Sequence, residues 1–228
     1  MEGVSRGMAE ERPKRRYNST RRQTQARETR RLILEAARKL FTTRGYAGTT
    51  IEALAHEAGV AVETVYATFG SKRAVLTRLV DILVLGDEEP TPLLERPDPQ
   101  AVRQEPDQRR QIRLFARGMS AIMERAGPLW GVIRAAADTD AEIAATLRRM
   151  LTSRRDNLLA FVGWVERNGP LRAGLNTEEA TDTVWSVSSA EVHHLLTVDR
   201  GWPRERYEQW LGNSLIALLL PPDLPGAQ

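Results

Sequence analysis

The 228-residue chain contains no cysteine, which excludes disulfide bonds and cysteine-based metal or redox sites. A reducing cytoplasm is therefore the expected location. Long hydrophobic runs are also missing, because no uncharged apolar stretch approaches the roughly 20 residues of a transmembrane helix. The first twenty residues carry charge but no apolar segment, so they do not form a secretory signal. We expect a cytoplasmic protein with no membrane partner.

Strand signals are nearly absent as well. The sequence shows no sustained alternation of apolar and polar residues bounded by Asn-Gly or Asp-Gly turns, and no internal repeat. It also contains no glycine-rich loop of the kind that binds phosphate. From Thr24 onward, hydrophobic residues instead recur at helical spacing, and this periodicity predicts an all-α fold.

Positive charge is concentrated at the N-terminus. The whole chain has a formal net charge of +3, yet residues 1–31 alone hold ten Lys or Arg and only four acids. A basic end on a nearly neutral body is typical of a protein that approaches phosphates with that end. We expect residues 1–23 to form a basic disordered arm. This arm is either a solvated tail or a direct DNA contact, and the two roles are compatible.

Residues 24–84 carry the first helical patterns. The first predicted helix ends at Arg44-Gly45 and has one apolar stripe, formed by Ile33, Ala36, Ala37, Leu40 and Phe41. Thr50 can cap a second helix, which ends at the tight turn Ala58-Gly59-Val60. A third short helix ends at Gly70, and Ser71 can cap a fourth.

Two short helices joined by a tight turn containing Gly form a helix-turn-helix, which we assign to residues 49–72. In this motif the second helix enters the major groove of DNA, which is about 12 Å wide and admits one helix. The structural alternative is an ordinary corner between two helices of an all-α core.

The string LILEAARKLFTTRGYAGTTIEALAHEAGVAVETVYATFGSKRAVL closely resembles the N-terminal domain of the TetR (tetracycline repressor) family. The densest match is Ala58-Gly59-Val60, Thr64-Val65-Tyr66, Phe69 and Ser71-Lys72. The resemblance covers about fifty residues. The remaining residues resemble the family only in forming a helical domain with an aromatic-rich interior and two amphipathic helices at the end. It implies DNA binding, with Thr50, Tyr66 and Lys72 at phosphates. Its implied outward face on the second helix of the motif comprises Ala61, Val62, Glu63, Thr64, Ala67 and Thr68.

Individual residues of this face differ in what they can do. Thr64 and Thr68 can hydrogen-bond bases or phosphates, and Val62 and Ala67 can contact thymine methyl groups. Val62 can equally belong to the core, because it shares a stripe with Val65 and Phe69.

The sequence departs from the family pattern at three positions of this helix. Ala61 replaces a common Ser and so lacks a side-chain cap. Glu63 stands where Gly or a basic residue is frequent, and an acid facing DNA is unfavourable unless it accepts a hydrogen bond from cytosine. Thr68 replaces a usual aromatic residue. These departures affect base preference more than the scaffold.

Composition changes abruptly at residues 86–107, which contain five of the twelve prolines and seven acids. Because proline disrupts helix interiors, we expect a Pro-rich loop within the second domain. Beyond it the pattern predicts helices at 108–126, from Pro128, at 140–168, at 177–198 and at 203–220. Asp140 and the pair Asn176 and Glu179 are expected caps.

All five tryptophans follow this loop. They are either core residues or part of a pocket for a flat or greasy molecule, and the family resemblance favours a pocket in this domain. The expected lining residues are Phe115, Met119, Trp130, Phe161, Trp164 and Trp185.

The last two predicted helices show apolar residues on more than one face, which suggests that they pack against a second copy of the chain. The expected homodimer interface comprises Val184, Val187, Tyr207, Trp210, Leu211, Leu215 and Leu218. The structural alternative is that these residues lie in the core of the monomer.

Two catalytic or metal-binding interpretations are weaker. Glu191 and His194 form a Glu-x-x-His pattern, but no second motif accompanies it and the chain has only three histidines. Ser189, His193 and Asp182 lack a nucleophile elbow and an oxyanion loop. We therefore expect no metal, no cofactor and no enzymatic activity.

The sequence thus predicts a helix-turn-helix domain at 24–84 and a helical ligand-binding and dimerisation domain at 85–228. The expected function is a ligand-responsive regulator of transcription, a repressor released from a palindromic double-stranded operator by a small apolar or aromatic molecule. A regulator that needs no ligand, or an activator, is an alternative, because the position of the operator decides the direction of control. A helical enzyme that keeps the motif as scaffold is the alternative from another class.

Overall fold

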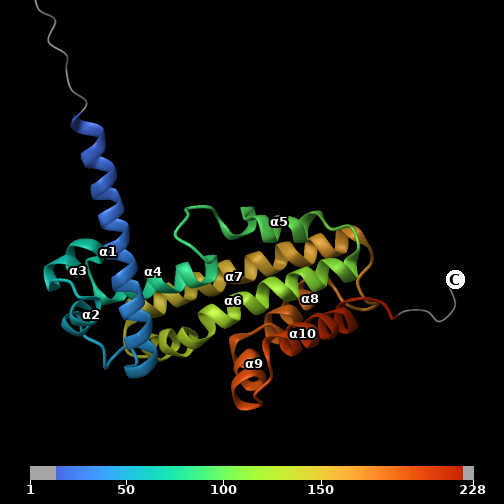
Figure 1. Cartoon of the computed structure of the whole chain (residues 1–228). Helices are drawn as coiled ribbons and strands as arrows, with labels where there is room; N and C mark the ends of the chain where they lie inside the picture. The colour runs from blue at the N-terminus through green and yellow to red at the C-terminus, as the bar shows by residue number, and fades with distance from the viewer. Residues whose placement is uncertain (1–13, 223–228) are drawn as a thin grey trace, which may run out of the picture.

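Helices form all of the regular structure in residues 14–222, the part of the chain that the computed structural model describes (Figure 1). Side chains are described from residue 21 onward. The all-α prediction is confirmed. In chain order the elements are α1 (Lys14–Arg44), α2 (Ile51–Ala58), α3 (Val62–Phe69), α4 (Lys72–Leu85), the 3₁₀ turn η1 (Leu93–Glu95), α5 (Pro97–Gln104), α6 (Gln108–Ala137), α7 (Ala141–Asn168), α8 (Thr177–Val187), α9 (Ala190–His194), the π-helical turn η2 (Leu195–Asp199) and α10 (Arg204–Leu219).

The first helix is longer than its apolar stripe. At 1.5 Å per residue, the 31 residues of α1 span about 46 Å. Its first half projects from the body of the molecule (Figure 1). The prediction of disorder is wrong for residues 14–23, which lack Pro and Gly and contain five Lys or Arg that favour helix. Residues 1–13 lie outside the described part of the chain.

Helices α1–α4 share one hydrophobic core, which does not stop at their boundary. Phe41 on α1, Leu54 on α2 and Val65 on α3 are fully buried there. The same core includes Leu129 and Ile133 from α6 and Ile143 from α7. The N-terminal helices are therefore packed directly onto the ends of two long helices of the second half.

Helix caps agree with the sequence in four places. The side chains of Thr50, Ser71 and Asp140 accept hydrogen bonds from backbone N–H groups in the first turns of α2, α4 and α7. Asn176 and Glu179 form the reciprocal capping box at the start of α8. Each cap satisfies N–H groups that the helix itself leaves unpaired.

The second half is built on the long helices α6 and α7, which lie side by side (Figure 1). Helices α8 and α10 cover one side of them around a second core that includes Ile112, Phe161 and Leu211. The prediction that Pro128 begins a separate helix is wrong, because α6 continues through it. Pro128 is exposed, so its ring meets solvent rather than a packed neighbour.

Residues 86–107 are not a simple loop. They contain η1 and the eight-residue helix α5, which runs along the outside of α6 (Figure 1). Pro97 occupies the first turn of α5, where a missing N–H costs nothing, and Val102 is buried. The Gln111 side chain donates from Nε2 to the Val102 carbonyl at 2.9 Å. A proline-rich composition is therefore compatible with this short helix.

The predicted helix 177–198 is interrupted. Helix α8 ends at Val187, and the buried Ser188 donates from Oγ to the Val184 carbonyl at 2.6 Å. Ser189 then caps α9 by accepting from Val192 N–H. Two adjacent serines supply local hydrogen bonds that compete with a continuous helix. The π-helical turn that follows exposes Val198.

Candidate DNA-binding surface and ligand cavity

Helices α2 and α3 meet at a tight turn that fixes the angle between them. Gly59 has φ +66°, a left-handed conformation that disfavours residues with a Cβ. The Val60 N–H donates to the Ala55 carbonyl at 3.0 Å and closes the end of α2. Val65 is completely buried beneath α3. This geometry is that of a helix-turn-helix, and it leaves one face of α3 open.

The open face of α3 carries small and polar residues. Ala61, Glu63, Tyr66 and Ala67 are exposed, whereas Val62, Thr64 and Thr68 are partly buried. Ala61 makes no side-chain cap, as its chemistry predicts.

Two of the predicted base-contacting residues, Val62 and Thr68, make contacts within the protein itself. Val62 packs against the N-terminal core, which favours the core alternative for this residue. The Thr68 hydroxyl donates to the Thr64 carbonyl at 2.7 Å, so it retains only its acceptor function for an outside partner.

Thr50 and Tyr66 are two of the three residues expected to contact phosphates. Thr50 is exposed at the start of α2, where its hydroxyl accepts from Ala53 N–H at 3.1 Å. Tyr66 is 50% exposed, and no hydrogen bond to its hydroxyl occurs among the described residues. Both groups are therefore accessible to a phosphate, as the resemblance implies.

Lys72 has a structural role that sequence reasoning missed. Its ammonium group donates to the carbonyls of Tyr46 at 2.8 Å and Thr49 at 2.7 Å, and lies 4.2 Å from the Tyr46 ring centroid. Burial lowers the pKa of Lys72. Lys72 thus ties the start of α4 to the segment that precedes α2, and two of its three protons are used inside the protein.

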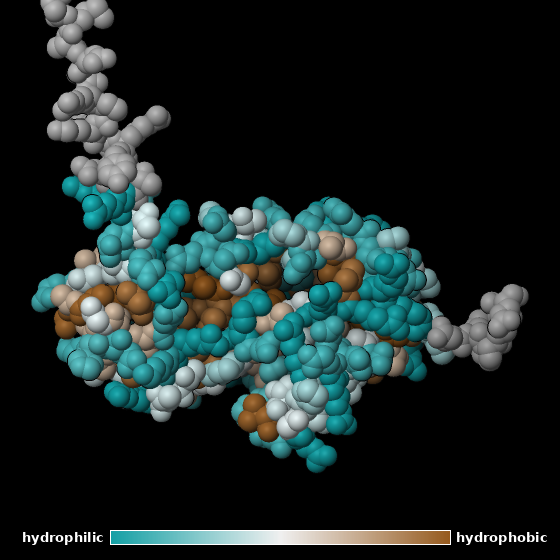
Figure 2. Space-filling model, viewed as in Figure 1, coloured by the Kyte–Doolittle hydropathy of each residue, from teal (hydrophilic) through white to brown (hydrophobic). Residues whose placement is uncertain are grey.

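A cavity of about 1240 Å³ lies in the second half, walled by α4, η1, α5, α6 and α7 and by residues of α8 and α9. Figure 2 shows apolar residues gathered between α5 and the layer of long helices beneath it. The structure places all six predicted pocket residues at this cavity, namely Phe115, Met119, Trp130, Phe161, Trp164 and Trp185. Phe115 and Phe161 stack with ring centroids 3.9 Å apart.

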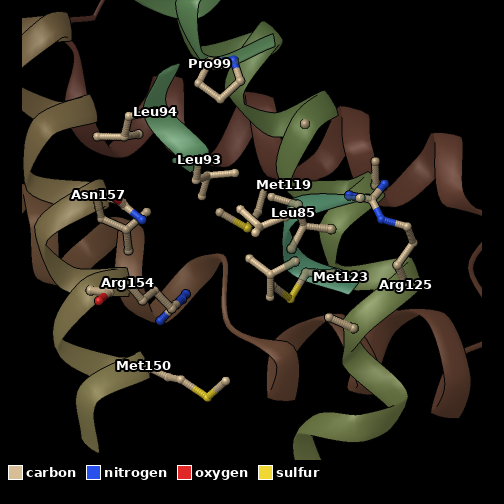
Figure 3. A pocket seen from close by; sticks show the side chains of 18 of the residues that line it. Leu85, Leu93, Leu94, Pro99, Met119, Met123, Arg125, Met150, Arg154 and Asn157 are labelled. Carbon is tan, nitrogen blue, oxygen red and sulfur yellow. The ribbon is translucent and has the colours of Figure 1, made fainter. Parts of the chain in front are cut away.

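Sequence reasoning missed the polar residues of the cavity wall. Figure 3 shows Arg154 of α7 and Arg125 of α6 among the apolar side chains. Arg154 donates from Nη2 to the carbonyls of Trp185 and Ser188 and to the Ser188 hydroxyl, at 3.0–3.2 Å. Arg125 donates from Nε to the Leu83 carbonyl at 3.0 Å, which joins α6 to the end of α4. Asp81 of α4 also lines the cavity, and burial raises its pKa.

The predicted dimer interface needs correction. Val184, Tyr207, Leu211 and Leu215 are fully buried in the single chain, so they cannot contact a second copy. Their stripe faces the core because α8 and α10 pack on α6 and α7. Val187 and Trp210 are partly buried, and Leu218 is 42% exposed. Only these three of the seven residues remain available.

The weaker catalytic and metal interpretations gain nothing from the geometry. Glu191 pairs with Arg134 at 3.1 Å, and His194 lies 3.6 Å from Asp199. The ring of His193 meets the Tyr207 ring edge-on, with centroids 4.7 Å apart. Across residues 14–222 there is no cluster of three His, Asp or Glu side chains suited to a metal ion. Within the same range no helix combines the length and apolarity needed to cross a membrane.

The comparisons with known proteins point to one family. Residues 33–79, which cover the last part of α1 to most of α4, match the family described as bacterial regulatory proteins, tetR family. No curated protein matches the chain.

Solved structures share the fold over most of their length. FadR from Bacillus subtilis in complex with stearoyl-CoA is similar with TM-score 0.66 and 16% identity, covering 82% of this chain and 97% of FadR. FadR from Bacillus halodurans gives TM-score 0.65 and 14% identity, with 82% and 94% covered. A TetR transcription regulator from Haloarcula marismortui gives TM-score 0.61 and 16% identity, with 84% and 98% covered.

Proposed function

We propose that this chain, whose residues 33–79 match the tetR family of bacterial regulatory proteins, is a ligand-responsive DNA-binding regulator of transcription. In this proposal residues 24–84 bind DNA, and residues 85–228 bind a small molecule and form a homodimer. The protein acts as a repressor that leaves a palindromic operator when the small molecule binds. Its chemistry is recognition, and no catalytic step is assigned to it.

The observation that carries the proposal is the open face of α3. A helix held at its turn by Gly59 and from below by Val65 presents Ala61, Glu63 and Ala67 to solvent. The small side chains of Ala61 and Ala67 allow the helix backbone to approach base edges in the major groove, whereas Glu63 is favourable there only as an acceptor from cytosine. Thr64 completes the base-contacting surface with a hydroxyl that can donate or accept.

Phosphate contacts position the helix. The Tyr66 hydroxyl on α3 and the Thr50 end of α2 are exposed and can bind phosphates. Lys72 contributes positive charge there while it holds the loop before α2. The projecting first half of α1 adds exposed Arg21, Arg22 and further basic residues, which can follow the backbone of the duplex.

Coupling between the cavity and the motif follows from shared elements. Helix α4 starts two residues after α3, and its second half lines the cavity. Helix α6 lines the cavity with Met119 and Trp130 and packs Leu129 and Ile133 into the N-terminal core. A ligand that shifts α4 or α6 therefore changes how the two DNA-binding heads are spaced. The stearoyl-CoA complex of FadR, which shares the fold, supports a small-molecule role for this region.

A homodimer provides the two heads. One helix in the major groove contacts too few bases to select a site. Helix-turn-helix proteins therefore usually present two DNA-binding domains, one from each subunit, about 34–36 Å apart. We place the interface on the outer faces of α8 and α10, where Leu218, Trp210 and Val187 offer apolar surface.

The test of DNA recognition uses Ala67→Asp. A carboxylate in the major groove meets the negative potential of the duplex, and we expect affinity for a duplex selected from a random pool to fall on the order of 100-fold. Ala135→Asp, an exposed substitution on α6, is the matched control. Fluorescence anisotropy measures binding and thermal melting confirms folding. Equal affinity of the two variants would contradict the assignment of α3.

A further inference from the structure

We propose that the cavity takes an amphipathic anion, a hydrophobic carboxylate whose headgroup pairs with Arg154 while its apolar body lies along the cavity wall. The inference rests on the proposed function of the cavity as the effector site. It narrows the expected effector from a small apolar or aromatic molecule to one that also carries a negative charge.

The first step is the unbalanced charge of Arg154. Its contacts are the carbonyls of Trp185 and Ser188, the Ser188 hydroxyl and the face of the Trp185 ring at 4.2 Å. All of these partners are neutral, and Arg154 forms no ion pair with a carboxylate among residues 21–222, whose side chains the structure describes. A partly buried guanidinium without a counter-ion is costly, because it has lost water and gained no opposite charge. An anion in the cavity would supply that charge.

The second step is the geometry of the donors. Every hydrogen bond that Arg154 makes within the described chain comes from Nη2. The N–H groups on Nε and Nη1 therefore remain for a ligand. The Nε and Nη1 N–H groups point to different sides of the guanidinium, so each can donate a single charge-assisted hydrogen bond to an oxyanion. Burial lowers the pKa of Arg154 to about 10, which leaves it charged at neutral pH.

The third step concerns the other charged groups of the wall. Arg96 is bound in two places by Asp87, and Arg134 is paired with Glu191. Glu191 is itself about half exposed, so solvent screens its attraction for Arg154. Arg125 also has no ion pair in the described chain, but it is less deeply buried than Arg154, and its Nε donates to the Leu83 carbonyl. Arg154 is therefore the most deeply buried of the cavity arginines that lack a carboxylate partner.

The fourth step is the apolar part of the wall. Leucine and methionine side chains line the same cavity as Arg154 (Figure 3), and they include Leu85, Leu93, Met119, Met123 and Met150. The Trp185 ring lies against the guanidinium itself. Methionine adapts its shape to different apolar partners. A cavity of about 1240 Å³ is too large for a bare inorganic anion, since drug-sized ligands already occupy pockets of roughly 300–1000 Å³. A charged head with a long or bulky apolar body fits both properties.

The experiment compares dodecanoate with dodecan-1-ol, which share the apolar chain and differ in charge. Binding to the full chain is measured by calorimetry and by tryptophan fluorescence, because Trp185 lies against Arg154. We expect dodecanoate to bind on the order of tenfold or more tightly than dodecan-1-ol. In Arg154→Gln this preference should disappear, and in Arg154→Lys part of it should remain.

Arg149→Gln is the matched control, since Arg149 lies on the same helix and at the same cavity but is exposed. It should keep the preference of the unmodified chain. Equal binding of the two compounds to the unmodified chain, or binding of neither, would overturn the inference even if Arg154→Gln failed to fold. Release of DNA by dodecan-1-ol alone would overturn it while leaving the proposed regulatory function intact. Failure of the ligand-free chain to bind DNA would instead contradict the proposed function.

Discussion

At the scale of single residues, two cations illustrate how this fold uses carbonyl oxygens. Lys72 and Arg154 are both partly buried, and each is held by main-chain carbonyls rather than by carboxylates. Lys72 donates two of its three N–H groups to carbonyls of the protein and so stabilises the segment that precedes α2. Arg154 keeps donors free and faces a cavity. The same chemistry thus serves structure at one site and recognition at the other.

Lys72→Met should lower the stability of the chain. It removes two hydrogen bonds from a charged donor, leaves the carbonyls of Tyr46 and Thr49 without this partner, and should cost about 1–3 kcal/mol. Lys39→Met is the control, because Lys39 is exposed and makes only a surface pair with Glu57. Melting temperatures followed by circular dichroism provide the comparison. A larger drop for Lys39→Met would contradict the anchoring role of Lys72.

Gly59→Ala should destabilise the helix-turn-helix through backbone strain alone. A Cβ at this position meets no atom within 4 Å, but the left-handed φ of +66° costs a non-glycine residue about 1–2 kcal/mol. Gly131→Ala on α6 is the opposite case, because it is helical and its Cβ also has open space. That substitution should stabilise the chain by about 0.5–1 kcal/mol. Shifts of the same sign in chemical denaturation would contradict this account.

His193 should contribute to loss of stability in acid. Burial lowers its pKa below 6.5 in the folded chain, so the unfolded chain binds the proton more readily. The contribution of neutral His193 to the free energy of unfolding is therefore complete above pH 6.5. It is lost as the pH falls through the pKa that His193 has in the folded chain. His193→Gln should show a smaller drop in melting temperature between pH 7 and pH 5 than the unmodified chain. His56→Gln, at an exposed position, should keep the original drop; a reversed order would argue against the burial of His193.

At the scale of elements, apolar periodicity and capping residues predicted the short helices best. Helices α2, α3, α7 and α10 appear within one or two residues of their expected bounds, because each has a clear start signal and one apolar face. Errors arose where a single residue type was given too much weight. Proline neither prevents α5, where it occupies the first turn, nor ends α6, where it is exposed. Conversely, two serines end α8 where no glycine or proline is present.

The cavity was predictable only in part. Its large apolar residues follow the Pro-rich segment in sequence and can be recognised as candidates for a wall. Arg154 looked like its exposed neighbours Arg149 and Arg155. A signal was present, however, because Arg154 occupies the inward position between Leu151 and Leu158 at helical spacing. A cation within an apolar stripe is the pattern that reveals such a site.

Leu218→Arg tests the proposed dimer surface on α10. Leu218 is 42% exposed, so arginine there can be solvated in a monomer but would meet the partner in a dimer. We expect a folded monomer in analytical ultracentrifugation. Leu211→Arg introduces charge at a fully buried position and should instead abolish folding, with loss of the cooperative melt. A folded dimer of Leu218→Arg would move the interface elsewhere.

At the scale of the whole molecule, the continuous N-terminal core explains how a cavity can influence a distant surface. Arg125 bonds the end of α4 to α6, and an ion pair between Arg73 and Glu142 joins the start of α4 to the start of α7. Helix α4 therefore contacts the long helices at both ends, while its N-terminus follows α3 directly. Movement of the cavity walls and movement of α3 are mechanically linked through this one helix.

Selection of bound sequences from a random pool of duplex DNA, with the full chain as bait, tests the central claim most directly. A two-headed helix-turn-helix protein should enrich an inverted repeat whose half-sites are centred about 10–10.5 base pairs, or a multiple of this distance, apart. The affinity for the enriched duplex should fall steeply with salt, since phosphate contacts release counter-ions. Enrichment of one symmetric sequence is the result that this account predicts. A pool that stays random through successive rounds would contradict it.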